Sequence, residues 1–136
     1  MRMLHAIPAM PASDMQRSIA FYRDKLGLTL GYHTEGFAKL LRDSIEVHLW
    51  AATDEGWKTR GGGTSPIVSG AESFIAGTAS CRISVEGVDE LHRVIEPLGV
   101  LHPNAKLQDT DFGTREFGVL DPDGNLVTFF ERTGPR

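Results

Sequence analysis

The order of apolar and amphipathic segments repeats once along this chain of 136 residues, and this repeat most constrains the fold. Each half contains a short strand, an amphipathic helix, and further strands that include a hairpin. A glycine ends the helical pattern in both halves, at Gly27 and at Gly99. A duplicated β-α-β-β-β unit accounts for this order. The sequence therefore predicts an α+β fold in which two such modules form a curved mixed sheet.

Local signals set the boundaries of these segments. Pro8 and Pro11 interrupt the first apolar stretch, which is typical of an edge or arm strand. Ser13 and Gln16 match a capping box, in which the serine caps the helix and the glutamine bonds back, and apolar spacing extends the helix to Leu26. The other expected elements are strands 28–33, 37–41 and 45–50, then strand 80–85, helix 88–98 and strands 116–120 and 126–130, with the turn Asp-Pro-Asp-Gly-Asn at 121–125.

One glycine-rich stretch fits neither half. Residues 53–79 hold six of the 15 glycines, without the lysine and following helix of a phosphate loop. We therefore expect a single domain, 1–136, with module one at about 1–52, an inserted loop at 53–79 and module two at about 80–132. In such a loop, Trp57 could close over a ligand or a neighbouring subunit, or pack on the edge of its own domain.

Composition narrows the function classes. Residues 1–60 carry 8 basic and 7 acidic groups (+1), and residues 61–136 carry 6 and 11 (−5), a balance that disfavours nucleic acid and suits a cationic ligand. The single cysteine, Cys81, cannot form an internal disulfide and is expected to be a small buried hydrophobe. We find no apolar run long enough for a membrane span and no signal peptide, so the expected compartment is the cytoplasm.

Several motifs give the sequence a family resemblance. Paired β-α-β-β-β units with an Asp-Pro-Asp-Gly-Asn turn resemble the vicinal-oxygen-chelate superfamily, which includes glyoxalase I, extradiol dioxygenases, and fosfomycin- and bleomycin-resistance proteins. The segments that resemble the bleomycin-resistance branch are Ile7-Pro8, Ala20-Phe21-Tyr22, Leu26-Gly27-Leu28, Gly36-Phe37-Ala38 and Phe112-Gly113-Thr114-Arg115-Glu116-Phe117.

The resemblance also implies where a metal site would lie. Enzymes of the superfamily carry ligands on the first and last strands of each half, which here correspond to Ile7, His48, Ser80 and Thr128. Only His48 is a competent ligand, because the other three offer an alkyl group or a neutral hydroxyl. A site made of His5, His48 and Glu131 would need large shifts in register. We therefore expect no protein-bound metal and no catalytic residues.

The resemblance implies a homodimer that sequesters bleomycin-type drugs, which are cationic glycopeptides with a planar bithiazole tail. The two drug sites would lie in grooves between subunits, and the N-terminal strand would be swapped at a hinge at Pro8. Resistance would be stoichiometric, with no cofactor and with copper present only as carried by the drug. The implied ligand-binding residues are Tyr32, Phe37, His48, Trp50, Trp57, Phe112, Gly113 and Arg115. Of the neighbours Arg115 and Glu116, alternation in a strand lets only one face the groove.

Two other function classes stay open at the level of the sequence. The first is a metal-dependent enzyme of the same superfamily, such as a thiol transferase, an isomerase or a dioxygenase. The second is a binder of another small aromatic or cationic compound, because Phe112 stands about one residue from the stacking aromatic of relatives that read Trp-Gly-Arg-Glu-Phe. A third alternative is an accessory protein of antibiotic biosynthesis in a producing organism. It differs from the others in its biological context more than in its binding chemistry.

Overall fold

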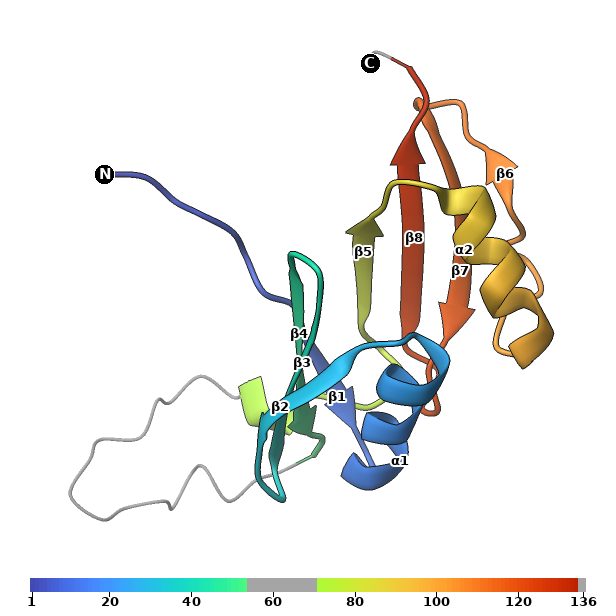
Figure 1. Cartoon of the computed structure of the whole chain (residues 1–136). Helices are drawn as coiled ribbons and strands as arrows, with labels where there is room; N and C mark the ends of the chain where they lie inside the picture. The colour runs from blue at the N-terminus through green and yellow to red at the C-terminus, as the bar shows by residue number, and fades with distance from the viewer. Residues whose placement is uncertain (54–70, 135–136) are drawn as a thin grey trace.

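The first module forms one four-stranded mixed sheet (Figure 1). The computed structural model describes residues 1–53 and 71–134, so Trp57 and most of the predicted inserted loop lie outside the described residues. The elements of this module are β1 (Ala9–Ala12), α1 (Met15–Ala20), a π-helical turn (Phe21–Lys25), β2 (Thr29–His33), β3 (Phe37–Arg42) and β4 (Ile45–Ala51). The strand order is β1-β4-β3-β2, with β1 parallel to β4 and the other pairs antiparallel.

The second module repeats this topology. A 3-10 turn (Ala71–Ser73) precedes β5 (Ser80–Ser84), α2 (Val88–Ile95), a second 3-10 turn (Glu96–Leu98), β6 (Gln108–Asp109), β7 (Thr114–Leu120) and β8 (Leu126–Arg132). The strand order is β5-β8-β7-β6, again with the first strand parallel to the last. The predicted α+β fold of two β-α-β-β-β modules is confirmed, and within the described residues each module has its own hydrogen-bonded sheet.

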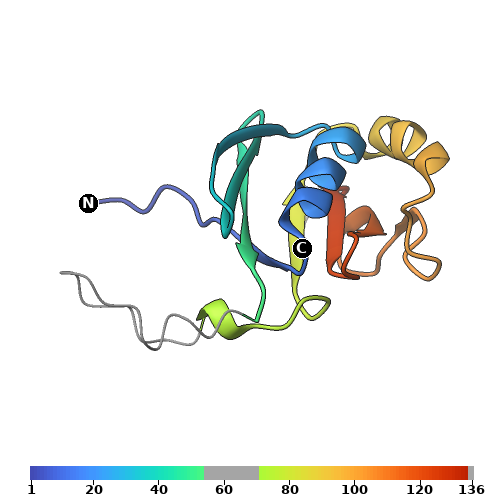
Figure 2. The same cartoon turned by 90° about the horizontal axis from the view of Figure 1, so that it is seen from below.

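Each helix packs on one face of the sheet of its own module (Figure 2). The covered faces supply a shared core that includes Met10, Leu40 and Leu49 from the first module and Phe117 and Val127 from the second. The opposite face of each sheet carries no helix in the described part of the chain. Side chains therefore alternate along every long strand between a buried face and an open face.

The predicted burial of the single cysteine is confirmed. Cys81 lies on β5 within the core and is 9% exposed. Burial, with a smaller contribution from the charge of Asp121, raises the pKa of the thiol to about 11. The thiol is thus protonated at neutral pH and is a poor nucleophile.

The beginning of α1 differs from the predicted capping box. The N-cap residue is Asp14, whose carboxylate accepts a hydrogen bond of 3.1 Å from the backbone N–H of Arg17. Ser13 does not cap the helix, because its hydroxyl and its backbone N–H both donate to the carboxylate of Asp123. A contact with a residue 110 positions away therefore decides which side chain caps the helix.

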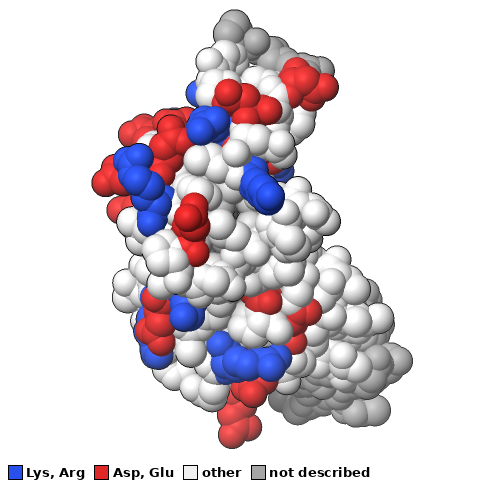
Figure 3. All heavy atoms as spheres, turned by 90° about the vertical axis from the view of Figure 1, so that its right-hand side faces the viewer, with Lys and Arg blue, Asp and Glu red and all other residues white. Residues whose placement is uncertain are grey.

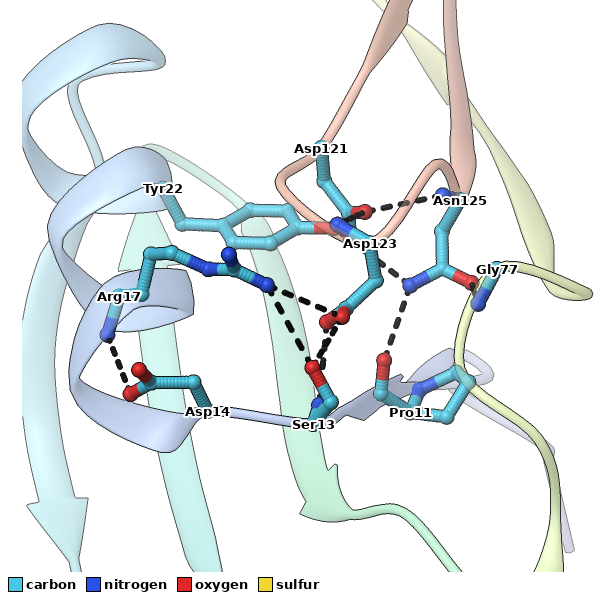
Figure 4. Close-up of polar contacts among 9 residues, drawn as sticks. All are labelled: Pro11, Ser13, Asp14, Arg17, Tyr22, Gly77, Asp121, Asp123 and Asn125. Atoms are coloured by element: carbon cyan, nitrogen blue, oxygen red, sulfur yellow. Dashed lines mark hydrogen bonds and ion pairs between the residues drawn. The ribbon is translucent and has the colours of Figure 1, made fainter.

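The turn 121–125 joins the two modules (Figure 4). Asp121 is buried and accepts hydrogen bonds from the Tyr22 hydroxyl (2.9 Å) and from the side-chain amide of Asn125 (2.8 Å). The same Asn125 amide donates to the carbonyl of Pro11 (2.9 Å), and its oxygen accepts from the N–H of Gly77 (2.8 Å). The turn thus holds the end of β1, the helical segment after α1 and the approach to β5.

The N-terminal residues form an extended arm. Residues 1–7 run away from both sheets before the chain enters β1 (Figure 1), and Met1, Met3, Leu4 and Ile7 are exposed. The prediction of an edge or arm strand is confirmed, because β1 lies at the edge of the first sheet. None of the helices in residues 1–53 and 71–134 has the length and apolar character that crossing a membrane requires.

The chain just after β4 meets the chain just after the 3-10 turn at Ala71–Ser73. The backbone N–H of Thr53 donates to the carbonyl of Phe74 at 3.1 Å. Farther on, the N–H groups of Gly77 and Ala79 both donate to the side chain of Asn125. The chain therefore leaves β4 and returns towards β5 at fixed points.

Candidate functional site

Aromatic side chains gather on the open face of the first sheet. Phe37 pairs with Trp50 across β3 and β4, and the next pair on the same face contains His48. The Phe37 ring contacts the His48 ring edge-on (centroids 4.9 Å apart), and Tyr32 on β2 stands 6.1 Å from Phe37. Phe37, His48 and Trp50 are half-buried, whereas Tyr32 is 63% exposed. We call these four residues the aromatic face; all four were predicted from the sequence.

A carboxylate completes this face. Glu46 lies two residues before His48 on β4, and its Oε2 is 2.6 Å from His48 Nε2. The other oxygen of Glu46 is 3.8 Å from Lys39 Nζ on β3. The aromatic face therefore combines flat rings with a carboxylate set between two basic groups, which suits stacking together with hydrogen bonding.

The open face of the second sheet carries an ion pair stacked on aromatic rings. Arg82 on β5 donates two hydrogen bonds to Glu116 on β7, at 2.8 and 3.1 Å. To reach that carboxylate, the guanidinium crosses β8 and lies 4.5 Å from the centre of the Phe130 ring. The hydroxyl of Thr114 also donates to Glu116, at 2.7 Å. The hydrogen bond from Arg82 is the main cause that lowers the pKa of the Glu116 carboxyl.

The predicted residues Phe112 and Gly113 lie in the turn before β7. Phe112 is 43% exposed, and its ring centre is 5.9 Å from the guanidinium carbon of Arg82. Gly113 has a positive φ of 85°, a conformation that favours glycine. The Thr110 hydroxyl closes the turn by accepting from the N–H groups of Phe112 and Thr114.

Arg115 points away from this group. It lies on the other face of β7, where it donates to Asp89 of α2 at 2.7 Å and to Asp109 of β6 at 3.3 Å. Glu116 is therefore the member of the adjacent pair that faces the open side. The structure does not bring Arg115 together with the aromatic residues, so its role in ligand binding stays a prediction.

The predicted site residues are divided between the two sheets. The aromatic face belongs to the first sheet, whereas Phe112 and Gly113 stand at the end of the second. Pro8 lies where the N-terminal arm meets β1, and its carbonyl accepts a hydrogen bond from the N–H of His48 at 3.0 Å. Arg82 and Phe130 were missed, although alternation of Arg82 with the core residues Cys81 and Ile83 is a signal that places it on the open face.

The residues at the implied metal positions do not suit a divalent metal. Ile7 is alkyl, Ser80 and Thr128 offer neutral hydroxyls, and His48 is paired with Glu46. Glu131, the alternative ligand, instead accepts hydrogen bonds of 3.1 Å from the N–H groups at the start of α2. Within residues 1–53 and 71–134, no group of three or more His, Cys, Asp or Glu residues could hold a metal ion.

Several carboxylates of the second half are paired with arginines. Arg82 pairs with Glu116, Arg115 with Asp89, and Arg17 of the first module with Asp123. On the face drawn in Figure 3, basic and acidic side chains accordingly lie next to one another. These three carboxylates are therefore less available to a cationic ligand than carboxylates without a basic partner.

Comparisons with known proteins agree with one another. Residues 2–129 match the family model described as "Glyoxalase/Bleomycin resistance protein/Dioxygenase superfamily". Bleomycin resistance proteins from Geobacillus stearothermophilus and Staphylococcus aureus are each 56% identical over 130 residues, which cover 96% of this chain and 98% of theirs. The bleomycin-binding protein of bleomycin-producing Streptomyces verticillus, solved with copper(II)-bleomycin, has a TM-score of 0.70 and 25% identity, and the match covers 99% of each chain.

Proposed function

The chain belongs to the glyoxalase/bleomycin resistance protein/dioxygenase superfamily, and we propose that it confers antibiotic resistance by binding bleomycin-type cationic glycopeptide drugs without modifying them. The observation that carries this function is the 56% identity with bleomycin resistance proteins over nearly the whole chain. The drug is held away from DNA, one molecule for each site. Any copper in the complex belongs to the drug, and the protein itself uses no cofactor.

The aromatic face supports this function through its chemistry. Planar heteroaromatic rings, such as a bithiazole, gain both apolar burial and favourable ring contacts when they stack on side chains like Phe37 and Trp50. Glu46 lies beside His48 on the same face and offers a carboxylate to a cationic or hydrogen-bonding group of the drug. We assign Tyr32, Phe37, His48 and Trp50 to one wall of the groove, and Phe112 and Gly113 to the other. Trp57 and Arg115 complete the proposed set.

The exposed arm supports a homodimer. Met1, Met3, Leu4 and Ile7 have no cover from the described part of their own chain, and an exposed apolar strand is a template for pairing with another copy. In this homodimer, the two copies exchange their N-terminal arms. We assign the hinge of the exchange to Pro8, because proline fixes the chain direction between the arm and β1. A second copy could also bring the second sheet of one subunit opposite the aromatic face of the other. The cytoplasm is the proposed compartment, since the drug must be intercepted before it reaches DNA.

Calorimetric titration of the chelator-treated protein with copper-bleomycin tests the function. We expect saturation near one drug per chain. Phe37→Ala and Trp50→Ala should each weaken binding by about fivefold or more, because truncation of an aromatic anchor in a binding site costs about 1 kcal/mol or more. Val94→Ala is the control, since Val94 is 62% exposed on α2, the helix on the covered face of the second sheet. Absence of binding by the wild-type protein, or turnover of a metal-dependent substrate, would overturn the function.

Sedimentation equilibrium tests the homodimer independently. The full chain should sediment as a dimer, and a variant without residues 1–7 should dissociate while keeping its circular dichroism spectrum. A monomeric full chain at the concentrations of the titration would contradict the arm exchange. The calorimetric titration tests the drug-binding proposal separately.

A further inference from the structure

We propose that Arg82 is the positioning residue for the Phe112 ring, and that it thereby tunes the site for a planar aromatic part of the ligand. This inference rests on the proposed function for the identity of the ligand. The arrangement of the ring, however, is a property of the free protein. The argument starts from what holds Arg82 in place.

Two contacts fix the guanidinium of Arg82, and a third residue orients its partner. The two terminal nitrogens of Arg82, Nη1 and Nη2, each donate to one oxygen of Glu116, at 3.1 and 2.8 Å, in the bidentate geometry that arginine forms with a carboxylate. The Phe130 ring lies beneath it, with its centre 4.5 Å away. Thr114 donates to the same carboxylate and so fixes the orientation of Glu116. Arg82 is therefore anchored on the open face, although its side chain is 45% exposed.

The anchored guanidinium then orders Phe112. The turn that carries Phe112 is closed by hydrogen bonds to its backbone, but these bonds leave the rotation of the side chain free. The ring is 43% exposed, and the guanidinium of Arg82 stands 5.9 Å from its centre. A cation over one face of a phenyl ring selects a subset of its rotamers and leaves the second face for a stacking partner. The free protein has then already lost the conformational entropy of that side chain, so ligand binding does not have to order it.

The choice of arginine matters for this role. A lysine at the same position would keep the positive charge but would lose the fork that fits the Glu116 carboxylate and the flat surface that stacks on rings. A methionine would keep an unbranched apolar stem, but it would lose the positive charge, the fork and the flat surface. Arg132 offers a matched control, because it also lies over Phe130, at 5.8 Å, from an exposed position on β8.

The first test measures ring order without any ligand. In protein labelled with carbon-13 in its phenylalanine rings, the Phe112 resonance should be dispersed in the wild-type protein and in Arg132→Met. It should move towards the random-coil position in Arg82→Met and, to a smaller extent, in Arg82→Lys. An unchanged Phe112 resonance in a folded Arg82→Met protein would overturn the positioning role.

The second test measures the ligand preference by calorimetry. The probes are copper-bleomycin and an analogue in which a non-aromatic spacer replaces the bithiazole. Arg82→Met should weaken copper-bleomycin binding about fivefold, an amount that corresponds to the ordering of one side chain, and should leave the analogue unchanged. The effect should disappear in a Phe112→Ala background, and Arg132→Met should bind both ligands as the wild type does.

The possible results separate the two proposals. Equal weakening of both ligands by Arg82→Met, or weakening that persists in the Phe112→Ala background, would show that Arg82 acts by another route and would overturn the inference. If the wild-type protein binds neither ligand, the proposed function fails and the ligand preference fails with it. The ring-order measurement would then still decide whether Arg82 positions Phe112.

Discussion

At the scale of single residues, Asn125 does the most to join the two modules. Its side chain is fully buried, and it donates to the Pro11 carbonyl and to Asp121 while accepting from the N–H groups of Gly77 and Ala79. These bonds use both donor hydrogens and the acceptor oxygen of the amide. No other side chain has that combination at this length.

Asn125→Ala should therefore destabilise the protein by about 3 kcal/mol, because it leaves buried backbone groups without partners. Urea unfolding followed by circular dichroism measures this change. Asn104→Ala is the matched control, since Asn104 is exposed in the loop before β6, and it should stay within about 0.5 kcal/mol of the wild type. A loss below about 1 kcal/mol for Asn125→Ala would contradict the assigned role.

The ion pair of Glu116 predicts a dependence of stability on pH. The hydrogen bond from Arg82, opposed by burial and helped by Thr114, lowers the pKa of Glu116 in the folded protein. Its contribution to stability is therefore complete above the ordinary glutamate pKa of about 4.3, and it is lost as the pH falls through the lower folded value. At pH 6, the free energy of unfolding of the wild type should exceed that of Glu116→Gln by about 1 kcal/mol. Near pH 2 this difference should disappear. A constant difference across this range in urea unfolding would refute the assignment.

At the scale of elements, the start of helix α2 depends on a carboxylate that comes from a strand. The helix has eight residues, too few to be stable alone, and its N-cap is Gly87, which has no side chain to offer. Glu131 on β8 replaces the missing cap by accepting from the N–H groups of Gly87 and Val88. Its negative charge also lies at the positive end of the helix dipole.

Glu131→Ala should cost about 1–2 kcal/mol, the usual value of a lost helix cap. Glu131→Gln should cost less, because it keeps one acceptor oxygen. Differential scanning calorimetry compares both with Glu35→Ala, an exposed residue in the loop before β3. Equal melting temperatures for Glu131→Ala and Glu35→Ala would rule out the capping role.

At the scale of the whole molecule, the shared core and the turn 121–125 predict that both modules unfold together. The buried cluster contains residues from both sheets, and Tyr22 of the first module bonds to Asp121 of the second. Neither module can lose its packing without exposing the surface of the other. The expected behaviour is a single cooperative transition.

Two probes, one in each module, can measure this cooperativity. In a Trp57→Phe variant, Trp50 fluorescence reports on the first sheet. Pulsed alkylation of the buried Cys81 reports on the second sheet, because its raised pKa of about 11 makes the folded thiol unreactive at pH 8. The urea midpoints of the two probes should coincide. Separate midpoints would mean that the modules unfold independently.

The sequence predicts most of this architecture, because periodicity and glycine stops are local signals. Gly27, for example, has the positive φ that ends the first helical segment. What it misses depends on distant contacts. Ser13 looks like a cap until Asp123 binds it, and β6 has only two residues, Gln108 and Asp109, too short for any alternation to show.

The same distinction holds for the candidate site. Phe37 and Trp50 come together because a hairpin fixes their register, and a hairpin can be recognised from neighbouring residues. Arg82 and Glu116 meet across an intervening strand, so their pairing requires the order of strands in the sheet. Alternation along β7 predicts that Arg115 and Glu116 face opposite sides of the sheet. Which of the two faces the open side depends on the position of α2, whose Asp89 binds Arg115.

The hydrogen bond between Thr53 and Phe74 has a consequence for how such proteins diversify. Thr53 and Phe74 are bonded to each other, and Asn125 anchors the chain beyond them, so the framework holds the flanks of the intervening stretch at fixed points. In general, doubling the length of a loop whose ends are held together costs only about 0.6 kcal/mol. Descendants can therefore lengthen, shorten or exchange this stretch while inheriting an unchanged framework. A foreign peptide or reporter sequence grafted there should be accepted on the same grounds.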